Sequence, residues 1–269
     1  MGHPAGRNRL SHTALVLSDL HLKEKGLDAR YPLFLEVISK FEQSSLDELI
    51  LMGDIFDILI GPKKFWLHIH PEFFEIIQRI ISKNKKVTWV QGNHDFQLGA
   101  LLKPLGIHWV EESEVLEREN CKIFISHGDL ADWSDKLHPV WRAFLTSKFL
   151  SFFIWLIPSR FGEKVLYPWT VKLSRASRKM SHKRAVAREE RARIIFRNYA
   201  DKKAKTYGCD LVLLGHSHIS DDYELNPHSK YLNFGSWFEE PAVGILQIDG
   251  NKLKSKVFKA AAWHPDTST

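Results

Sequence analysis

Short apolar runs alternate with amphipathic segments through the first half of the chain. The runs are rich in β-branched and aromatic residues, which is typical of buried strands. We expect strands over residues 14–17, 48–52, 87–91, 107–111, 114–119 and 121–126. Between these runs, apolar residues recur three and four positions apart, which is the spacing of one helix face. This pattern predicts helices over residues 31–41, 73–83 and 98–102.

The pattern changes after Asp129. Residues 133–205 have no strand pattern and read as helical, first rich in aromatic residues and then strongly basic. Strand patterns return over residues 210–214, 222–226, 231–235, 243–248 and 253–258, with tight turns such as Asp249-Gly250-Asn251 between them. We expect a core formed by residues 1–132 and 206–269, interrupted by a helical cap over residues 133–205. Strand–helix alternation followed by hairpin-linked strands predicts an α/β sandwich of two packed sheets with helices outside.

The basic residues are concentrated in the predicted cap. The chain of 269 residues carries a net charge of +6, yet residues 160–205 alone contain fifteen Lys and Arg against four Asp and Glu. Such an asymmetry favours a polyanionic partner or a membrane surface. No stretch of the sequence reaches the roughly 18–20 apolar residues that span a bilayer.

Cysteine usage and the N-terminus bear on the compartment. Cys121 and Cys209 form neither a CxxC spacing nor a disulfide framework, which favours a reducing compartment. The first residues lack the apolar segment of a secretory signal. We therefore expect a cytoplasmic protein that contacts the inner face of the cytoplasmic membrane through the cap, and we expect no protein partner.

Five short polar motifs follow predicted strands. Because ligands of open α/β sheets bind at the carboxyl ends of the strands, these motifs are expected to converge in one cleft. Carboxylate, imidazole and carboxamide groups are ligands for divalent cations, and a pair of cations hydrolyses phosphate esters. The motifs are Asp19-Leu20-His21, Gly53-Asp54, Gly92-Asn93-His94-Asp95, His127-Gly128-Asp129 and Gly215-His216-Ser217-His218.

Spacing within the motifs supports shared ligation. Asp19 and His21 are two residues apart, so both side chains lie on one face of an extended segment. Gly53 allows close approach of Asp54, whose two oxygens suit a bridge between cations about 3.5–4 Å apart. Asn93 offers a neutral oxygen. We expect two divalent cations. Mixed oxygen and nitrogen ligands suit Mn²⁺, Fe and Zn²⁺, and of these metals we expect Mn²⁺.

The order of the five motifs resembles the calcineurin-like metallophosphoesterase superfamily, whose pattern is DxH, GD, GNH[DE], H and GHxH. The resemblance covers residues 15–218. It implies a four-layer αββα sandwich, in which two packed mixed sheets are flanked by helices. It also implies that Asp19, His21 and His218 hold one cation, that Asn93, His127 and His216 hold the other, and that Asp54 bridges them.

The same resemblance implies roles for the two residues after Asn93. His94 would lie outside the ligands, near the scissile phosphate, and Asp95 would orient its ring. A metal-bridging hydroxide would attack phosphorus in line. His94 would stabilise the developing charge or protonate the leaving oxygen.

Further features resemble one branch, the UDP-2,3-diacylglucosamine pyrophosphatases of lipid A biosynthesis. These features are the chain length, the cap, His127-Gly128-Asp129 and Gly235-Ser236-Trp237. The branch implies hydrolysis of UDP-2,3-diacylglucosamine to the lipid monosaccharide 1-phosphate and UMP. The aromatic half of the cap would then hold acyl chains or rest at a membrane interface. The residues expected to bind phosphates are Arg175, Arg178, Lys179, Lys183 and Arg184.

Other interpretations remain open. Members of that branch often carry Arg where this chain has His94, so another phosphorylated lipid or nucleotide is an alternative substrate. A nuclease or nucleotide phosphohydrolase would use the basic half of the cap to bind a phosphate backbone, although the aromatic half suits acyl chains better. A non-enzymatic scaffold is disfavoured by the complete ligand set. His68 and His70 lie in a loop without such motifs, and we expect them at the surface.

Overall fold

The computed structural model describes most of the expected core and a small part of the expected cap. The described residues are 11–23, 25–61, 64–131, 185–238, 240–250 and 252–265, together with Ser147, Phe152 and Leu156; the side chains of residues 185–188 are excluded.

The first sheet has six strands, and its central part is parallel. The parallel strands are β1 (Ser11–Leu17), β2 (Glu48–Leu51), β4 (Lys86–Val90) and β6 (His108–Val110). β12 (Ala242–Asp249) pairs antiparallel with β1, and β13 (Lys252–Lys259) pairs antiparallel with β12. The order is β13-β12-β1-β2-β4-β6, so the carboxyl ends of β1, β2 and β4 lie at one edge.

The second sheet has five strands in the order β10-β11-β9-β8-β7. Its centre is parallel and its two outer pairs are antiparallel, so this sheet is also mixed. A further pair of two-residue strands, β3 (Leu59–Ile60) and β5 (Asp95–Phe96), lies outside both sheets. The five strands are β7 (Ser113–Arg118), β8 (Cys121–Ser126), β9 (Leu211–Leu213), β10 (Ser220–Asn226) and β11 (Ser229–Phe234).

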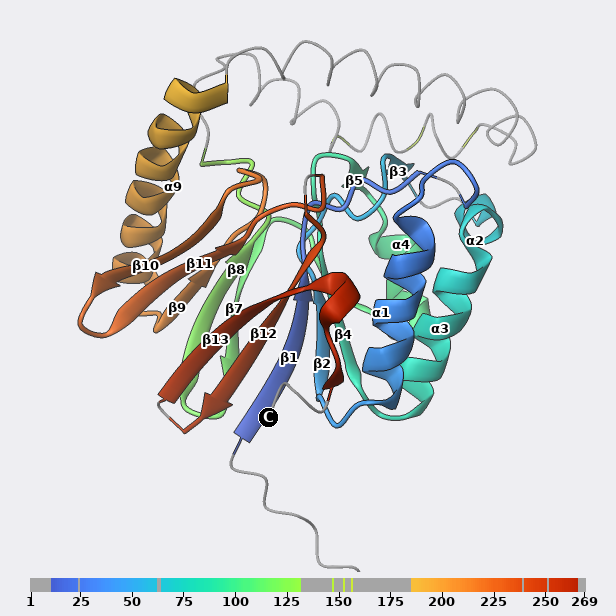
Figure 1. The fold of residues 1–269 in the computed structure, drawn as a ribbon, viewed down its shortest axis with the longest axis horizontal. Helices are drawn as coiled ribbons and strands as arrows, with labels where there is room; N and C mark the ends of the chain where they lie inside the picture. The colour runs from blue at the N-terminus through green and yellow to red at the C-terminus, as the bar shows by residue number, and fades with distance from the viewer. Residues whose placement is uncertain are drawn as a thin grey trace, which may run out of the picture.

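Helices cover the outer face of each sheet (Figure 1). α9 (Ala185–Tyr207) lies on the five-stranded sheet, and the other helices lie beside the six-stranded sheet. Those helices are α1 (Tyr31–Gln43), α2 (Phe65–Ile69), α3 (Pro71–Ser82), α4 (Gly99–Leu102) and the 3-10 helices η1 (Lys103–Leu105) and η3 (Ala260–Ala262).

Three apolar cores separate these four layers. Leu15 and Leu17 of β1 pack toward α1 and α3, whereas Val16 packs between the two sheets, as the two-residue period of a strand requires. Phe124 of β8 and Phe196 of α9 belong to the third core, outside the second sheet. The four-layer αββα arrangement expected from the sequence is therefore confirmed.

Every strand and helix expected within the described residues is present, with ends that differ by up to three residues. β1 begins at Ser11 rather than at Ala14, and β9 is the short segment Leu211–Leu213. Helix α2 and the short strands β3 and β5 were not expected. Helix α2 has a local cause: its residues Phe65 and Trp66 are buried, and they hold the helix against the core.

The surface position expected for His70 is wrong. His70 is 1% exposed, stacks on Phe56 with ring centroids 3.9 Å apart, and its Nδ1 lies 3.1 Å from the hydroxyl of Tyr31. His68, by contrast, is exposed as expected. Helix α2 ends at Ile69, between the two histidines. The two rings therefore lie on different sides of the chain, although the residues are only two positions apart.

The expected cap falls largely outside the described residues. Its C-terminal part is the described helix α9, which packs against β8, β9, β10 and β11 as the outer layer of the sandwich. The division into core and cap stays a prediction. Among the described residues, no helix has the length and apolar character needed to cross a membrane.

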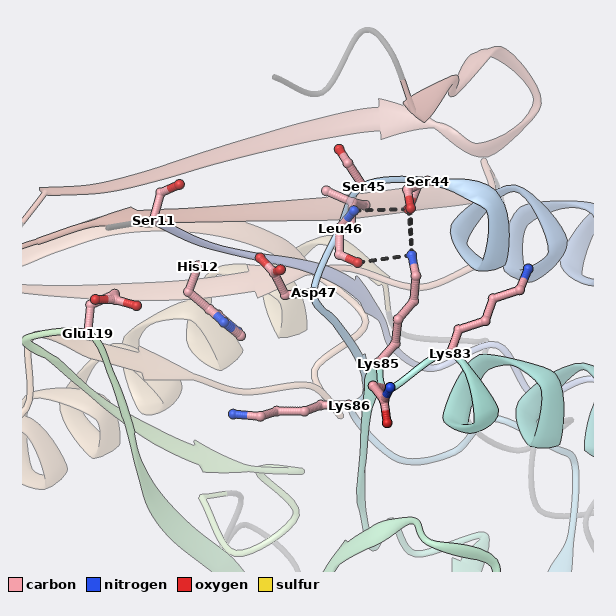
Figure 2. Close-up of a pocket in the computed structure, with 11 residues that line it drawn as sticks. Ser11, His12, Ser44, Ser45, Leu46, Asp47, Lys83, Lys85, Lys86 and Glu119 are labelled. Atoms are coloured by element: carbon pink, nitrogen blue, oxygen red, sulfur yellow. Dashed lines mark hydrogen bonds between the residues drawn. The ribbon is translucent and has the colours of Figure 1, made fainter. Parts of the chain in front are cut away.

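The two sheets are tied together at the edge that carries the amino ends of β1, β2 and β4. Glu48 of β2 accepts two hydrogen bonds of 2.8 Å from Arg118 of β7, and the side chain of Glu48 is fully buried. A hollow of about 420 Å³ opens nearby (Figure 2). The ammonium group of Lys85 there donates to the carbonyl oxygens of Phe41, Ser44 and Leu46, so it closes the end of α1. This edge is thus held by structural contacts, and the polar motifs lie at the other one.

Candidate metal centre

The five motifs meet where their strands end. β1, β2, β4, β8 and β9 end one or two residues before Asp19, Gly53, Gly92, His127 and Gly215, respectively. Main-chain hydrogen bonds join the loops: the N–H of His21 donates to the carbonyl of Asp54 over 2.8 Å, and the N–H of Gly215 donates to that of His127 over 2.8 Å.

The backbone is strained where the predicted ligands lie. Positive φ angles, which side-chain-bearing residues rarely adopt, occur at Asp19 (53°), His21 (46°), Asp54 (53°), His216 (64°) and His218 (60°). Eight residues other than glycine adopt such angles in the described part of the chain, and these are five of them. Strain of this kind persists only where the surrounding structure enforces it, and it clusters at functional sites.

One group of side chains comes from the first and last motifs. The atoms Nε2 of His21 and Nε2 of His218 lie 3.3 Å apart, and His218 Nε2 lies 3.3 Å from Oδ1 of Asp19. Asp19 and His21 are buried, whereas His218 is exposed. Asp19 is held in place because both of its oxygens accept the main-chain N–H of His216.

A second group comes from the third, fourth and fifth motifs. Nε2 of His127 lies 3.2 Å from Oδ1 of Asn93 and 3.3 Å from Nδ1 of His216. The ring of His127 is buried, and its Nδ1 lies 2.7 Å from the carbonyl oxygen of Met52. Because a carbonyl can only accept, Nδ1 carries a proton there and Nε2 faces the group.

Asp54 lies between the two groups. Its Oδ2 is 3.6 Å from Nε2 of His21 and 3.5 Å from Nε2 of His127. Its Oδ1 accepts the main-chain N–H of His94 over 2.8 Å, which fixes the carboxylate. One carboxylate oxygen is thus shared between an imidazole of the first group and an imidazole of the second.

Two motif glycines allow this close assembly. A Cβ at Gly215 would lie 2.8 Å from Oδ2 of Asp19, and a Cβ at Gly92 would lie 2.7 Å from Oδ1 of Asp95. Both distances are too short for a carbon–oxygen contact. Any side chain at either position would therefore push the motif loops apart.

The charges of the cluster are set by burial and by neighbouring groups. Burial raises the pKa of Asp54, but the imidazoles of His127 and His94 outweigh it and hold that pKa well below its ordinary value. Burial lowers the pKa of His127, but Asp54 outweighs it and raises that pKa well above its ordinary value. Burial dominates at His216 and lowers its pKa to about 4. Asp54 is therefore an anion, and His216 is a neutral imidazole.

These groups fit a pair of divalent cations. Three donors bound to one ion at about 2.0–2.2 Å lie roughly 3–4 Å apart, and the contacts within each group fall in that range. The donors are carboxylate oxygen, amide oxygen and imidazole nitrogen, which suit Mn²⁺, Fe and Zn²⁺ alike. Within the described residues, Nδ1 of His21 is buried and has no hydrogen-bond partner.

His94 lies beside the cluster, and Asp57 holds its ring. Nδ1 of His94 is 2.8 Å from the main-chain carbonyl oxygen of Asp57, and its ring meets the ring of His21 edge-on with centroids 4.7 Å apart. Asp57 is buried, and its carboxylate forms a further close group with His21 and His94. The sequence analysis missed Asp57, although a second carboxylate three residues after Asp54 was a visible signal.

Asp95 does not orient the His94 ring, contrary to the expectation. Its carboxylate accepts hydrogen bonds from the main-chain N–H groups of Asp54, Ile55 and Gly92 and from the indole of Trp89. The reason is geometric: consecutive side chains of an extended segment point to opposite faces, so Asp95 at the start of β5 turns away from His94. Asp95 braces the Asp54 loop instead.

Five basic residues of the cap are expected to contact substrate. Arg175, Arg178, Lys179, Lys183 and Arg184 all lie outside the described residues. Three residues of the cap segment before them are described: Nε2 of Gln97 donates to the carbonyl of Ser147 over 3.0 Å, and Phe152 and Leu156 are about half exposed.

The sequence analysis also missed an aromatic side chain at the rim of the cluster. The ring of Phe238 stacks on that of His21, with centroids 5.0 Å apart and planes 22° apart. The signal was its position directly after Gly235-Ser236-Trp237. Trp237 itself is buried in the core between the first sheet and its helices.

Comparisons with known proteins agree with this geometry. A family model described as calcineurin-like phosphoesterase matches residues 12–220. A UDP-2,3-diacylglucosamine hydrolase of Neisseria meningitidis is 23% identical over 243 residues, covering 88% of this chain and 95% of the relative. A protein of the same name from Coxiella burnetii is 24% identical over 259 residues, covering 95% of this chain and 90% of the relative.

Solved structures are similar at lower identity. A predicted phosphoesterase of Streptococcus pneumoniae is 17% identical, with a TM-score of 0.45 over 93% of this chain and 91% of that one. Vacuolar protein sorting 29 of Cryptosporidium parvum is 14% identical, with a TM-score of 0.45 over 93% of this chain and 98% of that one. Because both TM-scores lie below 0.5, nothing about the function of this chain follows from these two structures.

Proposed function

This chain belongs to the calcineurin-like phosphoesterase family, and we propose that it is a two-metal phosphohydrolase that cleaves the pyrophosphate of UDP-2,3-diacylglucosamine. The products would be the lipid monosaccharide 1-phosphate and UMP. The family and the candidate His and Asp metal groups support the coarser statement, a metal-dependent phosphoesterase. The substrate rests on the names of relatives at 23–24% identity.

The observation that carries the two-metal part is the position of Asp54. Its Oδ2 lies within 3.6 Å of one imidazole nitrogen from each group, so a single oxygen suits ligation of both cations. In this proposal Asp19, His21 and His218 hold one cation, and Asn93, His127 and His216 hold the other. Two such cations, when bound, neutralise phosphate oxygens and lower the pKa of a bound water.

The chain's own groups would complete the chemistry. Nδ1–H of His94 is engaged by Asp57, so Nε2 is the atom available to exchange a proton with the leaving oxygen. Asp95 keeps the Asp54 loop in place through its four hydrogen bonds. In this proposal His94 is the catalytic residue, and Asp95 is a positioning residue.

Two features favour an acylated substrate. Gln97, three residues after His94, is bonded to Ser147 of the cap segment, so Ser147 lies close to the candidate centre. Phe152 and Leu156, both helical, are 54% and 52% exposed. Exposed apolar side chains in the cap segment would suit acyl chains.

The test is a direct assay of products. The full chain is incubated with Mn²⁺ and UDP-2,3-diacylglucosamine in ¹⁸O water, and the products are identified by mass spectrometry. We expect UMP and the lipid 1-phosphate, with the ¹⁸O label showing which phosphorus was attacked. Asp54→Asn is expected to be inactive and Asp222→Asn, an exposed carboxylate on β10, active. Hydrolysis of single-stranded DNA but not of the lipid nucleotide would contradict the proposed substrate.

A further inference from the structure

Among the described residues, no protein group forms a hydrogen bond with the second ring nitrogen of His21. Ligating histidines generally donate their second ring N–H to a carbonyl, a carboxylate or water, which fixes the ring. His127 follows this rule through Met52. In the described part of the chain, Nδ1 of His21 is buried and without a hydrogen-bond partner. The described protein groups therefore orient the ring, with Nε2 toward His218 and Asp54, through contacts of another kind.

Ring packing supplies those contacts. Phe238 stacks on His21 at 5.0 Å and 22°, and His94 meets His21 edge-on at 4.7 Å and 90°. Phe238 also lies 5.2 Å from the ring of His218. One aromatic side chain thus covers two of the three predicted ligands of the first group. Phe238 is 37% exposed, so the protein does not use it as ordinary core packing.

Phe238 is itself held in place by Arg30. The guanidinium of Arg30 lies 5.5 Å from the centroid of the Phe238 ring, a distance typical of cation–π contact. The same guanidinium donates to the main-chain carbonyls of Trp237, over 3.1 Å, and of His21, over 3.3 Å. Asp28 orients it through bonds of 3.0 and 2.7 Å. Arg30 therefore joins the loop of Phe238 to the loop of His21.

A main-chain contact completes the connection. The N–H of Trp237 donates to the carbonyl of Asp19 over 3.3 Å, and the indole of Trp237 is anchored to the carbonyl of Ala242 over 2.6 Å. The residue before Phe238 is thus tied to the first motif. Phe238 cannot move away from His21 without breaking contacts to Asp19, Ala242 or Arg30.

We propose that Phe238, fixed by Arg30, is a positioning residue for His21 and sets the affinity of the first cation site. The inference rests on the proposed function, because His21 is a ligand only in that account. Stacking restricts the ring to the orientation in which Nε2 faces the cation. Without the Phe238 ring, the His21 ring can rotate. Cation binding must then fix its orientation, which weakens the affinity.

The experiment is a titration of the metal-free full chain with Mn²⁺, followed by calorimetry. The wild type is expected to bind two ions. Phe238→Ala is expected to bind one of them about tenfold more weakly, as changes of outer partners of ligating histidines do, with the other unchanged. Phe238→Tyr keeps the ring and is expected to match the wild type. Titration with Co²⁺ adds an absorption spectrum, which we expect Phe238→Ala to change.

Tyr223→Ala provides a matched control. Tyr223 is 41% exposed and has the guanidinium of Arg197 over its ring at 4.1 Å, but it lies on β10 away from the motifs. Tyr223→Ala is expected to bind both ions as the wild type does. Affinities of Phe238→Ala within twofold of the wild type, or equal losses in Tyr223→Ala, would overturn the positioning role. A wild type that binds no pair of ions would instead overturn the proposed function itself.

A double variant tests the part played by Arg30. If Arg30 acts by holding Phe238, then Arg30→Met weakens the same ion, and Arg30→Met/Phe238→Ala is no weaker than Phe238→Ala alone. Non-additivity of this kind is the mark of two residues that act as one unit. Fully additive losses would show that Arg30 acts independently of the ring.

Discussion

The Nδ1 atom of His94 lies 2.8 Å from the main-chain carbonyl oxygen of Asp57. A carbonyl accepts but cannot donate, so the neutral ring carries its proton on Nδ1, and the Nε2 lone pair is left for other chemistry. In the proposed two-metal account, Nε2 of His94 would exchange a proton with the leaving oxygen rather than bind a cation.

His94→Ala is therefore expected to lower kcat by about 10²- to 10⁴-fold, the usual contribution of a residue that exchanges a proton with the reacting group. Metal content, measured by plasma mass spectrometry, should stay near that of the wild type. His108→Ala is the matched control, because His108 is exposed, bonded to Glu114 and remote from the motifs. Loss of metal in His94→Ala would place His94 among the ligands and contradict its assigned role.

Asp95→Asn is expected to destabilise the fold as well as lower activity. The carboxylate accepts four hydrogen bonds from buried donors, and an amide nitrogen in place of one oxygen would face N–H groups. The expected loss is about 2–4 kcal/mol of unfolding free energy, measured by urea denaturation of the metal-free chain. His94→Ala, in the same assay, should unfold close to the wild type. Equal stability of Asp95→Asn and wild type would show that the bracing role is wrong.

The sequence alone predicted the positions of the strands and identified the polar residues at their ends. Strand positions follow from local apolar runs, and the motif residues are recognisable because each follows such a run. The end of each strand could be predicted because a polar motif residue follows the apolar run, as His127 follows β8. Those signals are local, so no knowledge of the packing was needed.

Contacts between residues that are distant in the sequence could not be predicted from such local patterns. Nothing in the sequence near His70 says that Tyr31 and Phe56 will enclose it. The partner of the His94 ring is a main-chain carbonyl, which any residue supplies, so its side-chain neighbour Asp95 was chosen wrongly. Phe238 reaches His21 only because two loops more than two hundred positions apart meet at the rim.

Metal binding is expected to release protons. Asp54 raises the pKa of His127 against the effect of burial, and Asp19 raises the pKa of His218 through a hydrogen bond and its charge. Both rings must lose a proton before they bind a cation, so affinity for Mn²⁺ should rise as the pH rises above 6.5, the ordinary pKa of histidine. Calorimetry in two buffers of different ionisation enthalpy gives the number of protons released. Binding that is independent of pH in this range would contradict the assignment of these rings as ligands.

His70 should make the fold sensitive to acid. Burial lowers the pKa of His70 from its ordinary value of 6.5 to about 3. Between these two pH values only the unfolded chain binds the proton, so stability falls as the pH falls, by about 1.4 kcal/mol per pH unit. His70→Phe should remove this part of the slope, measured by urea unfolding at several pH values, and His68→Phe should keep it. An unchanged slope in His70→Phe would show that His70 is not the group responsible.

The central claim is that two cations bind where the five motifs meet, and anomalous diffraction from crystals soaked with Mn²⁺ tests it most directly. We predict two peaks about 3.5–4 Å apart. One should touch Asp19, His21 and His218, and the other Asn93, His127 and His216, with Asp54 in contact with both. A single peak, or peaks that leave Asp54 in contact with neither ion, would contradict the account.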